Sequence, residues 1–273
     1  MKIALLQMTS GVDPLANART IVDAAAEAAR SGAAMLFTPE MSGLIDQNRK
    51  RAAASLHAEG DDPVLAATRT AAREHGIWVH LGSLAVHGND GRLANRGFVI
   101  DDAGEVRARY DKLHLFDVDL PSGESWRESA AYAPGANAVV VDTPVGALGL
   151  SICYDLRFAA LFAALSDAGA TVLATPAAFT RPTGAAHWHI LQRARAIESA
   201  AYVVSAAQTG THEDGRATYG HSVVIDPWGT VLLDMGEAAG LGFADIDPAR
   251  IADVRARVPV IAHRRPIPEV STT

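Results

Sequence analysis

Apolar runs and amphipathic segments alternate along the first third of the chain. The ranges 2–7, 33–37 and 77–84 are short and predominantly apolar, which predicts three buried strands. The ranges 13–32 and 62–76 each begin with Asp-Pro and end at a glycine, and their apolar residues recur at helical spacing. The pattern therefore predicts a βαβαβ order without a linker or a repeat.

Hairpins interrupt this alternation in the rest of the chain. A turn at 101–104 joins predicted strands near 98–100 and 105–110. A loop rich in Ser, Gly, Glu and Pro follows at 121–135, ahead of a second hairpin. The second hairpin and the remaining strands are expected at 139–141, 147–152, 171–174, 202–206, 222–225 and 230–233, and helices at 157–169, 186–200 and 248–257.

This order favours a mixed sheet, or two packed sheets, covered by helices. A parallel barrel would need a regular eightfold alternation of strand and helix, which the chain lacks. We therefore expect an α/β fold in a single domain spanning residues 1–273, with an extended tail from about residue 260.

Composition and charge narrow the class of protein. Of the 273 residues, 49% are hydrophobic and 20% charged, which is typical of a globular protein with a sizeable core. The net charge of −7 gives no electrostatic reason to expect nucleic acid or an anionic membrane as a partner. The N-terminal segment becomes polar too soon for a secretory signal, and no apolar stretch is long enough to span a bilayer.

The single cysteine, Cys153, excludes an internal disulfide framework, and no Cys/His spacing predicts a zinc site. His187 and His189 lie two residues apart on a predicted helix, hence on different faces, and make a poor metal pair. We expect no metal, no cofactor and a reducing cytoplasmic setting. His114 and His221 are interpreted as structural or supporting residues, and 226–229 as a turn with a packed indole.

Cys153 stands where the predicted strand 147–152 meets a helical pattern that starts near Arg157. A side chain at such a corner lies above the sheet and near backbone N–H groups, which suits a nucleophile. The alternative is a free thiol that packs as a small buried hydrophobe, the commoner fate of a lone cysteine.

Glu40 and Lys112 also stand just after predicted strands, and side chains at strand ends on one edge of a sheet can converge. A thiol needs a base or a neighbouring cation to become reactive at neutral pH. Glu40 is the candidate base, while Lys112 and the backbone N–H of Tyr154 are candidate oxyanion donors. Taken singly, each has a structural alternative, such as a solvated side chain or a helix cap.

At these positions the sequence resembles the nitrilase superfamily of carbon–nitrogen hydrolases. The resemblance implies that Glu40 is the general base, that Lys112 stabilises the tetrahedral species and that Cys153 is the nucleophile. Glu128 matches the family's second glutamate, which positions substrate and Lys112. The matching segments, in family order, are 38–40, 109–117, 128–135, 153–158, 175–179 and 220–229.

The resemblance also implies an α-β-β-α sandwich that pairs into a four-layer α-β-β-α-α-β-β-α homodimer or a higher homo-oligomer. In relatives, the helices after Arg157 and around 187–200 lie at that contact. Segments 186–198 and 206–210 are similar to the deaminated-glutathione amidase and ω-amidase branch. Three departures stand out: His189 replaces a usual Glu, Ala159-Ala160 a frequent Pro-Glu, and His80-Leu-Gly-Ser a more glycine-rich form.

The resemblance thus implies an amidase that converts a small linear carboxamide to the acid and ammonia through a thioester on Cys153. Its branch favours an acidic amide such as deaminated glutathione or α-ketoglutaramate. Arg157, and also Arg181, are candidates to hold a substrate carboxylate, although a helix-stabilising ion pair is an equal role for Arg157. The candidate oxyanion and substrate contacts are Tyr154, Arg157, Thr175, Ala178 and Phe179. The alternatives are an N-carbamoyl amino acid amidohydrolase, a nitrilase, or a catalytically silent binding relative.

Overall fold

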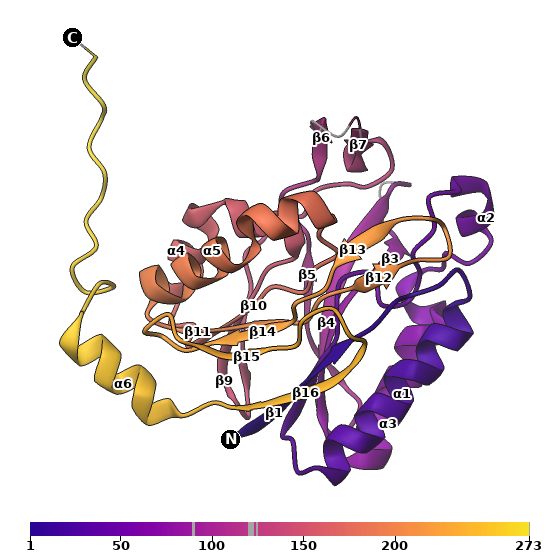
Figure 1. The fold of residues 1–273 in the computed structure, drawn as a ribbon, viewed down its shortest axis with the longest axis horizontal. Helices are drawn as coiled ribbons and strands as arrows, with labels where there is room; N and C mark the ends of the chain where they lie inside the picture. Colours follow the sequence, from indigo (N-terminus) through magenta and orange to yellow (C-terminus); the bar gives the residue numbers. More distant parts are fainter. Residues whose placement is uncertain (89–90, 120–122, 124, 273) are drawn as a thin grey trace.

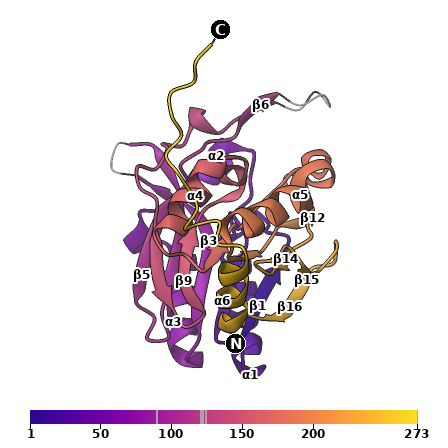
Figure 2. The ribbon, with the colours of Figure 1, turned by 90° about the vertical axis from the view of Figure 1, so that its left-hand side faces the viewer.

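Two six-stranded β-sheets form the centre of the protein (Figures 1 and 2). They are seen in a computed structural model of residues 1–273, which describes every residue except 89–90, 120–122, 124 and 273. The sheets pack face to face, and helices cover the outer face of each one. The expected α-β-β-α sandwich is therefore confirmed.

Strand order shows that the first half of the chain builds one sheet, to which β16 is added from near the C-terminus, and that the second half builds the other. In spatial order, the first sheet contains β16 (Gly240–Asp245), β1 (Lys2–Gln7), β2 (Met35–Phe37), β3 (Trp78–His87), β4 (Leu93–Ile100) and β5 (Val106–Asp111). The second contains β15 (Val231–Asp234), β14 (Val223–Ile225), β11 (Tyr202–Ser205), β10 (Val172–Ala174), β9 (Gly146–Leu150) and β8 (Val140–Thr143). Two small ribbons are added by β6 (Asp117–Asp119) with β7 (Ser125–Arg127) and by β12 (Thr209–Thr211) with β13 (Ala217–Tyr219).

Helices connect the parallel strands of each sheet. Strands β1, β2 and β3 run parallel, as the βαβαβ pattern predicts, and so do β9, β10 and β11. Helices α1 (Pro14–Arg30) and α3 (Pro63–His75) cover the first sheet, while α4 (Ala159–Asp167) and α5 (Arg181–Ser199) cover the second (Figure 2). Shorter elements are α2 (Arg49–Ala53), α6 (Pro248–Arg257), and the 3₁₀ turns η1 (Glu59–Asp61), η2 (Glu128–Ala130) and η3 (Cys153–Arg157).

Three helices begin in the same way, at an Asp-Pro pair. The carboxylates of Asp13, Asp62 and Asp247 each accept a hydrogen bond from a backbone N–H of the first turn, and the proline follows at the first helical position. The aspartate satisfies an otherwise unpaired N–H, while the proline has no N–H to leave unpaired. Helix α3 then ends at Gly76 in the left-handed region, a conformation that glycine adopts without strain. These boundaries match the sequence expectation.

Strand β1 illustrates how the two cores arise. Ile3 and Leu5 point into the core between the sheets, whereas Ala4 and Leu6 point into the core beneath α1 and α3. Alternate side chains of a strand face opposite ways, so a strand covered on both faces must be apolar throughout. This explains the continuous apolar run at residues 2–7.

The region after Cys153 differs from the predicted pattern. A 3₁₀ turn precedes the helix, and α4 begins at Ala159, two residues after the expected start near Arg157. Helix α5 begins at Arg181, five residues before the expected 186, because a proline in its first turn favours a helix start there. Because glycine disfavours a helix, Gly184 made this start hard to predict. A larger residue does not fit there, since an added Cβ would lie 2.3 Å from the ring of Tyr219.

Other elements were not expected from the sequence at all. Strand β16 begins with a glycine and has no strong apolar alternation, yet it pairs antiparallel with β1 from Lys2 to Gln7. Strand β7 and turn η2 lie within the predicted loop 121–135, of which residues 121–122 and 124 lie outside the described part. Helix α2 and the β12–β13 ribbon were also missed. Of these elements, β16 depends on a partner distant in sequence, whereas β7 and the β12–β13 ribbon pair with neighbouring strands.

The C-terminal segment leaves the body of the protein beyond Arg264, whose Nη1 donates to the carbonyl oxygen of Ala163 at 2.9 Å. Residues 258–272 form no helix or strand, and the chain extends away from the sandwich (Figure 1). Within the described residues, no helix combines the length and the apolar character needed to cross a membrane.

Candidate active site

Glu40, Lys112 and Cys153 converge on one cavity. Glu40 is the third residue after β2, Lys112 directly follows β5, and Cys153 is the third residue after β9. Lys112 Nζ donates to Glu40 Oε1 at 2.9 Å, and the Glu40 carboxylate is near enough to the Cys153 thiol to raise the pKa of that thiol. All three line a cavity of about 660 Å³. Residues that follow strands of both sheets therefore line a single cavity.

Lys112 lies between two carboxylates. Its Nζ is 2.9 Å from Glu40 Oε1 and 2.9 Å from Glu128 Oε2, and only 2% of the side chain is exposed. Burial alone lowers the pKa of an ammonium group. The charges of Glu128 and Glu40 more than offset this and hold the pKa of Lys112 well above its usual value. Lys112 therefore stays charged at neutral pH.

The protonation states of Glu40 and Cys153 follow from the same contacts. Burial raises the pKa of the Cys153 thiol well above its usual value, and the Glu40 carboxylate raises it further. Burial also opposes ionisation of Glu40. However, the charge of Lys112 and hydrogen bonds from Cys153, Lys112 and Asn95 leave the pKa of Glu40 below its usual value. The resting pair is therefore a protonated thiol beside an ionised carboxylate.

Both glutamates are held by several donors. Asn95 Nδ2 donates to Glu40 Oε1 at 2.9 Å and to Glu128 Oε1 at 3.1 Å. The backbone N–H of Ala178 donates to Glu40 Oε2 at 2.9 Å, and that of Phe116 to Glu128 Oε2 at 2.6 Å. Donors fixed by backbone and strand orient both carboxylates before any substrate binds, which is the preorganisation a catalytic site needs.

The backbone at Cys153 is strained. Its φ is +50°, in the left-handed region that non-glycine residues rarely occupy. The N–H of Cys153 donates to the carbonyl oxygen of Pro176 at 2.9 Å, which holds the turn. Such strain concentrates at functional sites, where the surrounding structure maintains it. Here the strained turn directs the thiol towards Glu40 and the cavity.

Asp155 holds the turn that carries Cys153 through several hydrogen bonds. Its carboxylate is fully buried and accepts hydrogen bonds from Ile152 N at 2.9 Å, Tyr110 Oη at 2.7 Å and His114 N at 3.0 Å. The ring Nδ1 of His114 lies 2.7 Å from the same carboxylate. Asp155 thereby ties β5 and the segment after it to the turn that carries Cys153.

Comparison with known proteins explains this arrangement. Residues 2–256 match the model of the carbon-nitrogen hydrolase family. The chain belongs to the carbon–nitrogen hydrolase family. It is therefore an enzyme of the class that acts on non-peptide carbon–nitrogen bonds. The superfamily expected from the sequence is confirmed.

Individual relatives support the assignment. The chain is 42% identical over 269 residues to the deaminated glutathione amidase of Rattus norvegicus, covering 97% of this chain and 82% of the relative. The NitFhit protein of Caenorhabditis elegans superposes with a TM-score of 0.90 at 40% identity, over 97% of this chain and 65% of that longer one. A glutamate-to-glutamine mutant of the amidase from Nesterenkonia sp. AN1, with acrylamide added to its active-site cysteine, superposes at 0.78 with 31% identity, over 95% and 98%.

Other predicted site residues of this carbon–nitrogen hydrolase divide into two groups. Glu128, Tyr154, Ala178 and Phe179 line the cavity with the three residues above. Thr175 does not: it is fully buried, and its hydroxyl lies 3.0 Å from that of Ser151. The structure therefore leaves Thr175 beneath the site.

Arg157 and Arg181, the candidates to hold a substrate carboxylate, are not among the residues that line the cavity. Arg157 Nη1 lies 3.2 Å from His187 Nδ1, and its guanidinium rests 5.5 Å from the ring centroid of Phe179. Arg181 lies 3.7 Å from Glu237. In this carbon–nitrogen hydrolase Arg157 thus joins the turn after Cys153 to α5, which fits the structural alternative for that residue.

Several site residues were missed from the sequence. Asn95 lies within a strand pattern and carries no local signal, although it bonds both glutamates. Arg216 and Trp126 line the cavity, with the guanidinium 4.6 Å from the indole centroid. Arg216 Nε and Trp126 Nε1 are buried and have no hydrogen-bond partner among the described residues. Such atoms are ready to bind polar groups of a substrate.

Two supporting interpretations can also be checked. His114 stacks on Phe158 with ring centroids 3.6 Å apart and binds Asp155, which is the supporting role expected of it. Residues 226–229 do form a turn, closed by the N–H of Gly229 and the carbonyl of Asp226. The prediction that the indole in this turn is packed was wrong, however, because Trp228 is 53% exposed.

Proposed function

We propose that this carbon–nitrogen hydrolase is an amidase that cleaves a small linear carboxamide through a thioester on Cys153. The observation that carries the proposal is the Glu40 carboxylate, which accepts a hydrogen bond from Lys112 Nζ and lines one cavity with Cys153 and Lys112. No metal or organic cofactor is required, since the nucleophile, base and oxyanion donors are groups of the chain.

The first half of the reaction forms the thioester. As Cys153 Sγ bonds to the carbonyl carbon, its proton passes to Glu40. The charge that develops on the carbonyl oxygen is stabilised by Lys112 Nζ and the backbone N–H of Tyr154. Glu40 then returns the proton to the nitrogen, the carbon–nitrogen bond breaks, and ammonia or an amine leaves.

The second half hydrolyses the thioester. Glu40 removes a proton from water as the oxygen attacks the thioester carbon, and the same donors hold the new oxyanion. The carbon–sulfur bond breaks, the proton returns to Cys153 and the acid leaves. Glu128 acts throughout by holding Lys112 charged and in place.

The cavity lining supports an anionic substrate. Four arginines line it: Arg49, Arg92, Arg127 and Arg216. Arg127 is paired with Asp119 at 2.8 Å, whereas Arg216 Nε lacks a partner among the described residues. The size of the cavity suits an amide larger than a simple two-carbon compound. We therefore propose an amide of a dicarboxylic acid, such as deaminated glutathione or α-ketoglutaramate.

A substrate screen tests this proposal. Purified protein is incubated with deaminated glutathione, α-ketoglutaramate, N-carbamoyl amino acids and nitriles, and the released acid and ammonia are quantified. Cys153→Ala is the blank. We expect acid release from the dicarboxylic amides only. Preferential cleavage of N-carbamoyl compounds or nitriles would replace the substrate proposal, and no turnover of any of them would favour a binding protein.

Mass spectrometry examines the covalent step separately. A quenched reaction should show a mass increase on Cys153 equal to the acyl group of the substrate. Turnover by the parent protein without any such adduct in the quenched reaction would contradict the thioester.

We also infer a homodimer and a cytoplasmic setting. Ile190 and Ile197 lie seven residues apart on α5, hence on one face, and are 71% and 48% exposed. Trp228 and Leu232 are exposed apolar side chains too, and Ile197 lies against Gly229. Such a patch suits a second copy of the chain. Light scattering should give a dimer that Ile190→Asp dissociates. A thiol that must stay reduced fits a reducing compartment.

A further inference from the structure

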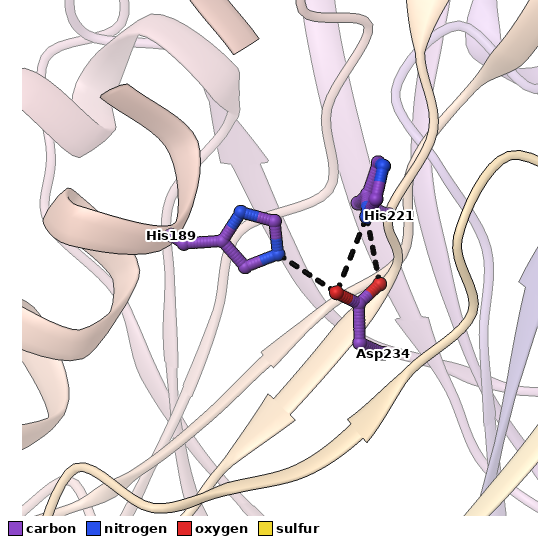
Figure 3. A group of neighbouring side chains, drawn as sticks. All are labelled: His189, His221 and Asp234. Atoms are coloured by element: carbon purple, nitrogen blue, oxygen red, sulfur yellow. Dashed lines mark hydrogen bonds and ion pairs between the residues drawn. The ribbon is translucent and has the colours of Figure 1, made fainter. Parts of the chain in front are cut away.

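A second cluster of ionisable side chains lies outside the cavity described above. It consists of His189 on α5, His221 just before β14 and Asp234 at the end of β15 (Figure 3). None of the three is among the cavity-lining residues, so the proposed amidase chemistry does not use them. Figure 3 shows both imidazoles directed at the Asp234 carboxylate.

The donor atoms of the cluster are close enough to share one ion. His189 Nε2 lies 2.9 Å from Asp234 Oδ2, while His221 Nδ1 lies 2.9 Å from Oδ1 and 3.2 Å from Oδ2. All three donor groups lie within 4.8 Å of one another. Donors around a tetrahedral zinc ion lie roughly 3.3 Å apart, given bonds of about 2.0 Å. The two histidine–aspartate contacts therefore need to open by only a few tenths of an ångström to admit the ion, and the two imidazole donors lie within 4.8 Å of each other.

The cluster is also held in place before any ion binds. His221 has a φ of +56°, which is uncommon for a non-glycine residue. Its N–H donates to the carbonyl of Gly236 at 2.7 Å, and its own carbonyl accepts from Trp188 Nε1 at 2.8 Å. The ring stacks on Tyr219, with centroids 4.4 Å apart. These contacts maintain the strained backbone of His221, and this backbone directs the imidazole towards Asp234.

Asp234 is oriented from its own side. The backbone N–H of Gly236 donates to Asp234 Oδ1 at 2.9 Å, which leaves Oδ2 facing both histidines. The side chains of His189, His221 and Asp234 are 32%, 21% and 33% exposed. An ion can therefore reach the cluster from solvent, and water can complete its coordination.

We propose that His189 Nε2, His221 Nδ1 and the Asp234 carboxylate bind a divalent transition-metal ion of the zinc type. Two imidazoles and one carboxylate are nitrogen and oxygen donors that suit Zn²⁺, Co²⁺ or Ni²⁺ better than Mg²⁺ or Ca²⁺. Each neutral imidazole carries one proton, which moves to the other ring nitrogen when the metal takes the first. Binding then requires no proton release from neutral histidines.

The bound ion adds a link between helix α5 and the second sheet, in which β14 and β15 are already paired through their backbones. It links α5 to the segment before β14 and to β15. Helix α5 also carries Trp188, whose indole packs edge-on against Phe179 in the cavity wall with centroids 4.9 Å apart. The metal is thus a structural brace near the site, and we expect it to raise the melting temperature.

Metal titration of the full chain tests the proposal. Untagged protein carrying Cys153→Ala, which removes the competing thiol ligand, is stripped with chelator and titrated with Zn²⁺ by calorimetry. Co²⁺ is titrated in parallel by absorption. We expect one ion per chain. His189→Ala, His221→Gly and Asp234→Asn should each weaken binding by roughly tenfold or more. Glycine is used at 221 because it tolerates the left-handed backbone.

His187→Ala is the matched control, since His187 is an exposed histidine on the same helix and bonds Arg157 instead. It should bind Zn²⁺ like the parent. The melting temperature should rise with Zn²⁺ in the parent and the control, but not in the three cluster variants. Failure to bind one ion per chain, or equal affinity in parent and cluster variants, overturns the site. Either result leaves the amidase proposal intact, because turnover is measured separately with Cys153 present.

Discussion

Lys112 Nζ donates a hydrogen bond to Glu40 Oε1 at 2.9 Å across 72 residues of sequence. Both side chains are nearly inaccessible to water, at 2% and 6% exposure. A buried ion pair is unfavourable unless further groups satisfy its remaining hydrogen bonds. Here Glu128, Asn95 and a backbone N–H do so, and the pair keeps a carboxylate ionised beside the Cys153 thiol. The predictions below follow from this relationship and from the residues around it.

Glu40→Gln should abolish most turnover while preserving the fold. The amide keeps the shape of the side chain and an oxygen for Lys112, but it cannot accept the proton of Cys153. General-base catalysis typically contributes about 10²–10⁴-fold, so we expect kcat to fall by that order. Steady-state kinetics measures this, with circular dichroism to verify folding. A variant within threefold of the parent would show that another group is the base.

Lys112→Met should destabilise the protein as well as inactivate it. Removing the ammonium leaves Glu40 and Glu128 buried without their cation, which typically costs about 3–5 kcal/mol. Urea unfolding measures the loss. The double variant Lys112→Met/Glu128→Gln should recover part of the stability and none of the activity. If the double variant were no more stable than the single one, the charge account of this cluster would be wrong.

The pH–rate profile should be flat through neutrality and fall only in acid. Hydrogen bonds and the charge of Lys112 overcome burial and hold the pKa of Glu40 below its ordinary 4.5, so Glu40 stays ionised until the pH drops below that value. The stability that Glu40 contributes is present above pH 4.5 and lost as the pH falls through its lowered pKa.

Asn95→Leu tests the cause of this shift, because Asn95 is one of the donors that lower the pKa of Glu40. The acid limb of kcat/KM should move to higher pH in Asn95→Leu and stay in place in a surface variant such as Arg193→Gln. An unchanged limb in Asn95→Leu would assign the acid limb to another group.

Stability should also depend on His80 in acid. His80 is fully enclosed in β3, and burial lowers its pKa from 6.5 to about 3. Because the unfolded chain takes up this proton at higher pH than the folded one, stability declines as the pH falls from 6.5 towards 3. Urea unfolding of the parent and of His80→Gln across this range should show a shallower decline in the variant. Parallel declines would exclude His80 as a source of acid sensitivity.

Arg216→Gln should lower kcat/KM for a dicarboxylic amide more than for a neutral amide. Hydrogen bonds to charged groups contribute about 1.5–3 kcal/mol, which corresponds to roughly ten- to a hundredfold. Arg157→Gln is the comparison, since Arg157 is turned towards His187 outside the cavity lining. We expect the larger loss at Arg216. A larger and substrate-selective loss at Arg157 would restore the role that the sequence suggested for it.

The local pattern of the chain determined much of the first sheet. Asp13, Asp62 and Asp247, each followed by proline, mark helix starts because capping depends only on neighbouring residues. The apolar run 2–7 predicts a strand covered on both faces, and β1 is one. Glu40, Lys112 and Cys153 could be singled out because each follows a strand, and resemblance to a known family gave them candidate roles.

Contacts between distant segments decided the rest. Asn95 reaches Glu40 and Glu128 only because β4 lies beside β5 and β3 in the sheet, and no local pattern marks it. Arg216 reaches the cavity while Arg157 does not. His189 meets His221 and Asp234 through the packing of α5 on the second sheet. Backbone propensity and capping act over a few residues and are therefore visible in sequence, whereas the direction of a side chain relative to a remote one is set only when the two sheets pack.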